Sequence, residues 1–140
     1  ANLNLVRKFE LTELRRSELR YFRIALNEVK ASGGRAYVHL GKVGTPDILV
    51  IIADFFNRVE SFDWVLVSGV HGDKLVVIFR CDGYRKNAGK LAKTTFGRFG
   101  PAGGHKEAAR AESPIKNLPL REGQEFTTKT LIRLSTQHIK

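Results

Sequence analysis

The chain has 140 residues, 42% of them hydrophobic, which is enough for one folded core and too short for two ordinary domains. Its longest uninterrupted apolar run, 48–53, is far shorter than the roughly 20 residues of a membrane span, so we expect a soluble protein. Twenty-four Lys and Arg against fourteen Asp and Glu give a formal net charge of +10, which favours polyanionic partners.

The ends and the single cysteine give two further expectations. The chain contains no methionine and opens on no secretory signal, so we expect a processed or excised piece. Cys81 has no second cysteine with which to form an intrachain disulfide, which is compatible with a reducing compartment. We therefore expect a cytoplasmic location.

The first half of the chain predicts a helix, a strand and a second helix. Apolar residues recur at helical spacing over 19–29, where we expect Leu19, Phe22, Leu26 and Val29 to form the apolar face of an amphipathic helix that Gly33-Gly34 ends. Segment 35–43 has the period of two that is typical of a strand. Thr45-Pro46-Asp47 is typical of a helix start and predicts a buried helix to about residue 59.

The second half predicts a hairpin, a helix and another strand. Two β-rich runs, 62–71 and 74–81, flank Gly72-Asp73, which can form a two-residue turn. Segment 88–96 predicts a short helix that Gly97 ends, followed by a glycine-rich loop over 97–105 and a strand over 108–115. Segment 126–139 fits a helix or a threonine-rich strand, and we expect a helix.

This order of elements predicts an α/β (α+β) fold in a single domain, with a mixed sheet of about four to five strands flanked by helices. We expect the core of the domain over about 3–115 and a C-terminal extension over 116–140.

The loop 97–105 is the main candidate for a binding site. Four glycines within eight positions let its backbone expose consecutive N–H groups to an anion. Around it, 80–110 holds eight basic and two acidic residues, a net +6. The loop follows a helix and enters a strand, the reverse of a dinucleotide-binding or P-loop entry. The sequence therefore predicts a phosphate site of another kind.

Two side chains near the loop suit a phosphate. His105, directly after Gly103-Gly104, can donate a hydrogen bond to a phosphate oxygen, and the alternative is a solvated histidine. Arg80, at a strand end, offers a planar fork for two phosphate or carboxylate oxygens, and the alternative is a surface ion pair, for example with Asp82.

Accessory contributions are expected from the same basic segment. Tyr84 and Phe99 flank it and could stack on bases, while Arg98 and Lys106 add to the positive field. Tyr37 and Trp64 lie in apolar strands and are assigned to the core.

Catalytic groups are not evident. The histidines at 39, 71 and 138 have no carboxylate or thiol partners at metal-ligand spacing, and no Ser-His-Asp or Cys-His arrangement stands out. The aspartates are isolated instead of paired as in a two-metal site. The sequence predicts binding residues without catalytic machinery.

Three segments carry a family resemblance: Phe-Arg-Cys-Asp-Gly-Tyr-Arg-Lys at 79–86, Ala-Gly-Lys-Leu-Ala at 88–92 and Gly-Pro-Ala-Gly-Gly-His-Lys-Glu-Ala-Ala at 100–109. Together they resemble the DHH-associated C-terminal domain of DHH-family phosphoesterases. That family includes RecJ-like exonucleases, nanoRNA and phosphoadenosine phosphate phosphatases, and exopolyphosphatase-related proteins, of which the last look closest. The resemblance covers about 3–115 and is strongest over 74–115.

The resemblance implies roles for particular residues. In this family the second domain clamps the phosphate or nucleotide end of the substrate, and Arg80, Gly103, Gly104 and His105 match its strand-end arginine and Gly-Gly-Gly-His loop. Cys81 stands where the family has serine, and Pro101 and Ala102 break the glycine run. These departures bear on which substrate the site accepts.

The resemblance also implies a missing catalytic half. In the family an N-terminal domain holds an Asp-His-His motif and a manganese pair, and no Asp-His-His occurs in these 140 residues. The implied partners are a nucleotide, oligonucleotide or polyphosphate substrate and an N-terminal DHH domain of the same protein, without a membrane, and a homodimer is left open. The chain alone would then be inactive.

Two alternatives belong to other classes of protein. One is a stand-alone basic module for single-stranded nucleic acid, which would bind through its net charge and stacking and would tolerate loss of His105. The other is a regulatory or dimerisation domain, which would self-associate without any ligand.

Overall fold

One mixed sheet organises the chain in the computed structural model, which describes residues 14–139. The predicted core, beginning near residue 3, therefore has its first residues outside the described part. Six strands lie in the order β1-β2-β3-β4-β6-β5. They are β1 (Lys30–Ser32), β2 (Arg35–Lys42), β3 (Trp64–His71), β4 (Lys74–Cys81), β5 (Ala102–Gly104) and β6 (Ala108–Pro114). β2 and β3 pair in parallel and the other neighbours are antiparallel.

The predicted fold class is confirmed, with six strands in place of four to five. The two additional strands, β1 and β5, have three residues each, too few for a period of two to show in the sequence. β1 forms because Gly33 and Gly34 both have positive φ, which makes a tight turn back into β2 instead of only ending a helix.

Within the described residues 14–139, four α-helices and two 3-10 turns accompany the strands. The helices are α2 (Leu19–Glu28), α3 (Asp47–Asn57), α4 (Ala88–Phe96) and α5 (Thr128–Thr136), and the turns are η1 (Arg16–Glu18) and η2 (Ile115–Asn117). The Asn87 side chain accepts from the Lys90 N–H at the start of α4, and Thr127 accepts from the Thr130 N–H at the start of α5. The expected C-terminal helix is thereby confirmed. None of these helices is long and apolar enough to cross a membrane.

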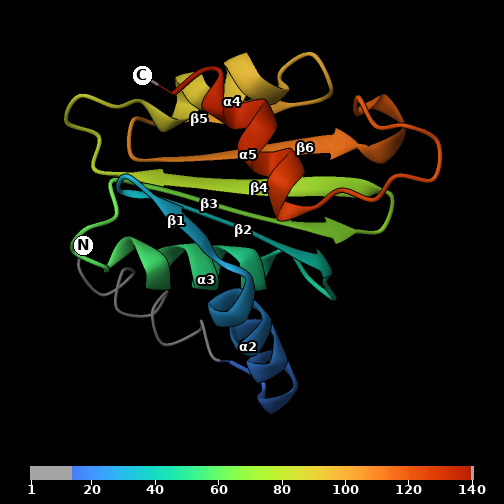
Figure 1. Cartoon of the computed structure of the whole chain (residues 1–140), viewed down its shortest axis with the longest axis horizontal. Coiled ribbons are helices and arrows are strands. Elements are labelled where there is room, and N and C mark those ends of the chain that lie inside the picture. The colour runs from blue at the N-terminus through green and yellow to red at the C-terminus, as the bar shows by residue number, and fades with distance from the viewer. Residues whose placement is uncertain (1–13, 140) are drawn as a thin grey trace, which may run out of the picture.

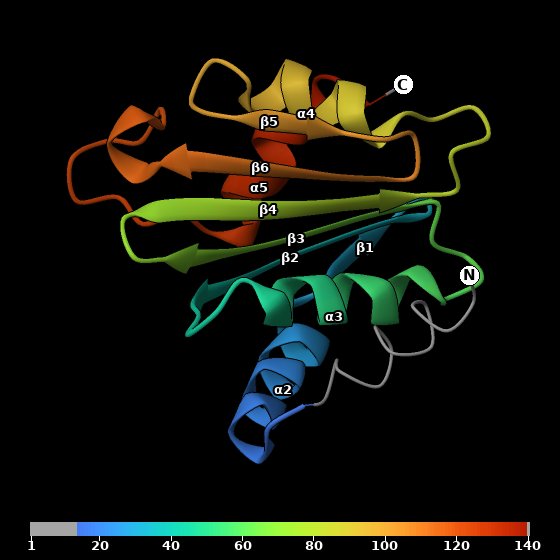
Figure 2. The ribbon, with the colours of Figure 1, turned by 180° about the vertical axis from the view of Figure 1, so that it is seen from behind.

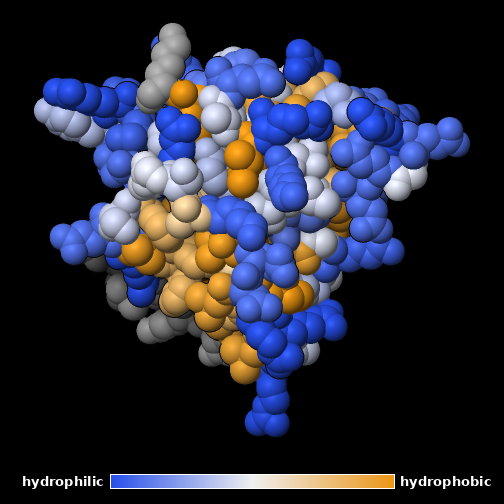
Figure 3. Space-filling model, in the orientation of Figure 1, coloured by the Kyte–Doolittle hydropathy of each residue, from blue (hydrophilic) through white to orange (hydrophobic). Residues whose placement is uncertain are grey.

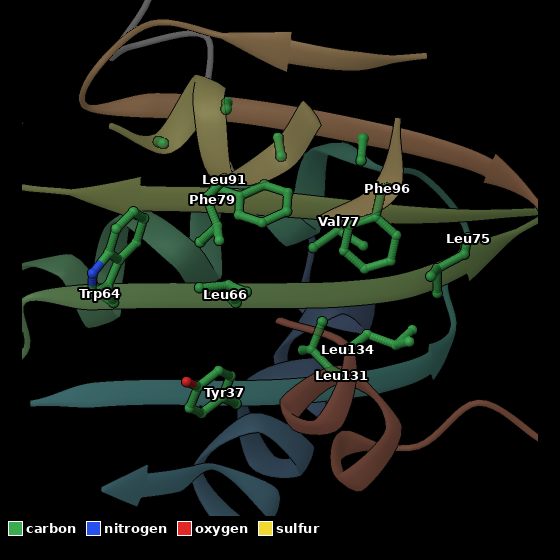
Figure 4. Close-up of a cluster of buried hydrophobic side chains, with 14 of the residues drawn as sticks. Tyr37, Trp64, Leu66, Leu75, Val77, Phe79, Leu91, Phe96, Leu131 and Leu134 are labelled. Carbon is green, nitrogen blue, oxygen red and sulfur yellow. The ribbon is translucent and has the colours of Figure 1, made fainter. Parts of the chain in front are cut away.

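The helices cover the sheet as two layers, with α2 and α3 on one face and α4 and α5 on the other (Figures 1 and 2). Side chains alternate along β4, so that Leu75, Val77 and Phe79 face α4 and α5. Val76 and Ile78 face α2 and α3. The α4 side contains the larger cluster, which includes the buried Tyr37 and Trp64 that the sequence assigned to the core (Figure 4).

The C-terminal segment is part of this packing. Phe126, Leu131 and Leu134 belong to the same cluster as Phe79 and Phe96. Because these residues of α5 and of the segment before it pack in that cluster, the hydrophobic core continues beyond residue 115.

Helix α2 turns a different face to the sheet from the predicted one. Leu19 and Leu26 are exposed, whereas Tyr21 and Ala25 are buried. Phe22 is only partly buried and meets the ring of Phe55 on α3 edge to face. Helical spacing identified the helix, but the packing against β2 and α3 decided its rotation, because two apolar stripes were present in one short segment.

Candidate phosphate-binding site

The glycine-rich segment is a strand of the sheet instead of a free loop. β5 pairs with β6, and Gly103 lies opposite Arg110. In an antiparallel pair, hydrogen-bonded and non-bonded positions alternate. Glu112 N–H donates to the Pro101 carbonyl and His105 N–H to the Ala108 carbonyl, so the Gly103–Arg110 pair between them is also a bonded one. Gly103 N–H is therefore used within the sheet, and the expected run of consecutive free N–H groups does not form.

Gly104 has the conformation and the close contacts that require glycine. Its φ is 152°, and a Cβ there would lie 2.5 Å from the Ala108 carbonyl oxygen and 2.8 Å from the Ala109 Cβ. It occupies a non-bonded position of the β5–β6 pair, so its own N–H points away from β6, out of the edge of the sheet. This N–H is one of the backbone donors at the edge of the sheet.

The start of α4 holds the β5–β6 turn in place. Ala88 N–H donates to the Lys106 carbonyl and Gly89 N–H to the His105 carbonyl, both at 2.8 Å. Gly89 is needed here because a Cβ would lie 2.8 Å from the Gly104 carbonyl oxygen. Since Asn87 caps the next N–H of the helix, the first turn of α4 has internal partners and positions His105 instead of binding an anion itself.

The register brings Arg80 and His105 into one row across the sheet. Arg80 on β4 lies opposite Ala108 on β6, and Ala108 accepts from the His105 N–H at the end of β5. Residues paired across strands share a face of the sheet, so Arg80, Ala108 and His105 project from the same side. The small Ala108 side chain lies between Arg80 and His105. The Cα atoms of Arg80 and His105 are about 10 Å apart, which is two strand spacings.

Arg80 is oriented by two partners. Its Nε donates to Asp54 Oδ1 on α3 at 2.8 Å, and its Nη1 donates to the Phe79 carbonyl at 3.0 Å. The side chain is 17% exposed, whereas Asp54 is open to solvent. A guanidinium has five N–H donors, so three remain for a ligand. The surface ion pair that the sequence left open does exist, with Asp54 in place of Asp82.

Among residues 14–139, no helix packs over β5 and β6 on the face from which the row projects. On this face α3 packs on β3 and β4, while β6 and β5 receive their helix, α4, on the opposite face. We call the strip formed by Arg80, His105, Ala108, Gly103 and Arg110 the β5–β6 shelf. Its floor consists of an alanine and a glycine, so a ligand can approach the backbone closely.

The accessory residues divide between the two ends of β6. Tyr84 and Lys106 are exposed in the turns after β4 and before β6, at the Arg80 end. The Phe99 carbonyl accepts from the Asn117 side chain, and Gly100 lies against Glu112, so Arg98 and Phe99 lie at the other end. Phe99 is also only 8% exposed, packed against Phe96 and under the Arg98 guanidinium. Arg98 and Phe99 therefore lie away from Arg80 and His105, and the burial of the Phe99 ring argues against base stacking on it.

Positive charge gathers on the α4 side of the molecule. Residues 83–106 contain six Lys and Arg and no acidic residue. Over 14–139 only three ion pairs form: Arg80–Asp54, Lys86–Asp82 and Arg110–Glu112. Figure 3 shows mainly hydrophilic residues in the upper part of the view and a hydrophobic area in the lower part. The basic segment 83–106 therefore contributes a positive field on the α4 side of the molecule.

Cys81 is a structural thiol. Its Sγ donates to the Lys106 carbonyl at 3.0 Å, and burial raises the pKa of the thiol. It helps hold the turn after His105, and its burial disfavours the thiolate form that a nucleophile needs. Within 14–139, no three His, Cys, Asp or Glu side chains are grouped as a metal site would require.

Three candidate site residues were not predicted from the sequence: Ala108, Arg110 and Asp54. The alternation in 108–113 contained a signal for the first two, because Ala109, Ala111 and Ser113 are buried and the intervening residues therefore share the other face. Asp54 had no such signal, since it lies on a helix 26 positions before its partner.

Comparison with known sequences gives a limited result. No family model matches the chain. An uncharacterized protein of Methanocaldococcus jannaschii is 30% identical over 90 residues, which are 64% of this chain and 18% of that protein. The match thus spans less than a fifth of the length of the relative.

The fold occurs in several solved structures. An exopolyphosphatase-related protein from Bacteroides fragilis matches 90% of this chain and 36% of its own, with a TM-score of 0.64 and 15% identity. The DHH domain of a member of the s1p family of ribosomal proteins matches 86% of this chain and 30% of its own (TM-score 0.51, 18% identity). The C-Ala domain of Aquifex aeolicus alanyl-tRNA synthetase matches 63% of this chain and 84% of its own (TM-score 0.52, 17% identity).

These neighbours confirm the predicted resemblance to the DHH-associated domain as a likeness of fold. The synthetase domain shares the same fold, so function has to be argued from the site itself.

Proposed function

We propose that this chain binds a phosphate group of a nucleotide, short oligonucleotide or polyphosphate, as the substrate-binding C-terminal domain of a DHH phosphoesterase. The parent enzyme would hydrolyse phosphodiester or phosphomonoester bonds. The observation that supports this most directly is the row Arg80–Ala108–His105 on an uncovered face of the sheet. The likeness of fold to an exopolyphosphatase-related protein and to a DHH domain agrees with it.

Each residue of the row has a defined task. Arg80, oriented by Asp54, presents its remaining N–H donors to two phosphate oxygens. His105 donates from the opposite side of Ala108. The methyl group of Ala108 is small enough to let the phosphate lie between the two side chains.

The hydrolytic step belongs to an N-terminal DHH domain in this proposal. Manganese ions on that domain would activate the attacking water. The residues of this chain bind and orient the phosphate end, so the isolated chain is expected to bind without hydrolysing.

Calorimetry with AMP and with inorganic phosphate tests the binding step. Replacing His105→Ala or Arg80→Gln should weaken AMP binding at least tenfold, because each removes a charge-assisted hydrogen bond. Arg98→Gln is the matched control, since Arg98 lies at the far end of β6, and it should bind AMP as the parent chain does. If AMP binds equally well with and without His105, the site assignment is wrong.

Calorimetry with an oligonucleotide at several salt concentrations distinguishes the proposed phosphate-binding domain from a stand-alone module for single-stranded nucleic acid. The exposure of Tyr84, 84%, favours this alternative, because an exposed ring can stack on a base. The burial of Phe99 leaves that module without its second stacking ring. That module would bind oligonucleotides with a steep salt dependence and tolerate His105→Ala. Self-association without ligand would instead indicate a dimerisation domain.

A further inference from the structure

We infer that the β5–β6 shelf contains a second anion subsite, formed by Arg110 and Lys93 over Gly103. It rests on the proposed function, because the first phosphate is the one bound by Arg80 and His105. The ligand it selects is one in which two phosphates are joined through a ribose, such as a 5′-phosphorylated dinucleotide.

Arg110 is placed for this role by register. It lies opposite Gly103 on β5 and opposite Ile78 on β4, so it stands on the same face as Arg80, in the next row along β6. Its Nε lies 2.9 Å from Glu112 Oε2 in an ion pair, and the side chain is well exposed. Glu112 lies on one side of the guanidinium. Among residues 14–139 no hydrogen bond to its Nη groups forms, so these donors can meet a second anion.

Lys93 reaches the same place from α4. Its Cε lies 3.9 Å from the position that a Cβ on Gly103 would occupy, and no other atom lies within 4 Å of that position. The ammonium is one bond from this Cε, within reach of a ligand that lies over Gly103. Among residues 14–139, no acidic side chain pairs with Lys93.

The spacing of the two subsites restricts the ligand. Ala108 and Arg110 are two residues apart on one strand, about 7 Å along β6. Successive phosphates of a nucleic-acid strand, separated by one ribose, can span this distance. Adjacent phosphates of a polyphosphate share an oxygen atom and lie closer together. The geometry thus favours a nucleic-acid end over a pyrophosphate unit.

Calorimetry on the 140-residue chain with AMP and with 5′-phosphorylated diadenylate tests the subsite. The dinucleotide should bind the parent chain more tightly than AMP does. Arg110→Gln should weaken dinucleotide binding about tenfold and change AMP binding less than twofold, because only the second phosphate loses a charge-assisted contact. Lys93→Gln should act in the same direction. Arg133→Gln, an exposed arginine on α5, is the matched control and should change neither affinity.

Two outcomes overturn the inference: Arg110→Gln and Lys93→Gln leave dinucleotide binding unchanged, or they weaken AMP binding equally. Pyrophosphate binding as tightly as the dinucleotide would overturn the ligand class. The failures of the two proposals are distinguishable. If Arg80→Gln does not change the affinity for AMP, the proposed function is wrong. If Arg80→Gln weakens AMP binding but Arg110→Gln leaves dinucleotide binding unchanged, only the second subsite is wrong. Far-UV circular dichroism of each variant verifies that the fold is intact.

Discussion

At the scale of single residues, the two adjacent glycines of the site have opposite reasons to be glycine. Gly104 is required by the backbone, because its φ is 152° and three atoms of Ala108 and Ala109 would lie within 3 Å of a Cβ. Gly103 has free space around its Cβ position, with only the Lys93 Cε at 3.9 Å. The lack of a side chain at Gly103 instead keeps the surface of the shelf open to a ligand.

This contrast gives a pair of matched variants. Gly104→Ala should destabilise the chain by about 2 kcal/mol or more, because the β5–β6 hairpin must distort. Gly103→Ala should change the free energy of unfolding by less than about 1 kcal/mol, since alanine suits a strand at least as well as glycine. Urea denaturation of both variants measures the difference. Equal stabilities would show that the close approach at Gly104 is not needed.

At the scale of elements, the site depends on how α4 and α5 close one face of the sheet. The first turn of α4 binds the carbonyls of His105 and Lys106, and α5 covers the strands beside it. The segment after residue 115 was predicted as an extension. Its Leu131 is fully buried, so this helix stabilises the sheet on which the shelf stands.

Leu131→Ala should therefore lower the free energy of unfolding by about 2–5 kcal/mol, the range for a buried leucine that leaves a cavity. Leu26→Ala is the matched control on α2, where the side chain is exposed, and its effect should stay within about 0.5 kcal/mol. Thermal or urea denaturation of the two variants checks the prediction. A small effect at Leu131 would mean that α5 is not part of the cooperative unit.

At the scale of the whole molecule, His39 joins three elements across the sheet. Its Nδ1 is 2.8 Å from Ser68 Oγ on β3, its backbone N–H donates to Thr128 Oγ1 on α5, and its ring meets Phe126. Burial lowers the pKa of His39 from 6.5 to about 4. The imidazole is therefore neutral in the folded chain at pH values where it is already charged in the unfolded chain.

Global stability should follow this difference in pKa. As the pH falls from about 6.5 to 4, the unfolded chain takes up a proton that the folded chain does not, so the free energy of unfolding decreases, by at most about 3 kcal/mol from this group. Below pH 4 its contribution is constant. Urea denaturation of the parent chain and of His39→Gln at pH 7, 5 and 4 isolates it, because the carboxylates are common to both. Parallel pH curves would contradict the prediction.

Local patterns were sufficient for most elements and for part of the site. The helix starts at Asp47 and Ala88, the Gly72 turn and the strand over 108–114 all follow from spacing, caps and glycines, which act between neighbours in sequence. The strands β1 and β5 did not, because three residues contain no period. The position of Phe99 was missed for a related reason, since an aromatic residue beside basic ones suits a stacking surface and a core equally well.

The sequence by itself determined that this chain has a mixed sheet between helices, a basic glycine-rich segment and the residues Arg80 and His105 beside it. Only the tertiary structure decided that β6 lies between β4 and β5, which places those two side chains on one face with Ala108 between them. It also placed Asp54 against Arg80 and moved Arg98 and Phe99 to the far end. The physical reason is that strand pairing brings together residues that are distant in sequence. The strand order and register are fixed by the burial of apolar side chains against the helices, which a local pattern does not contain.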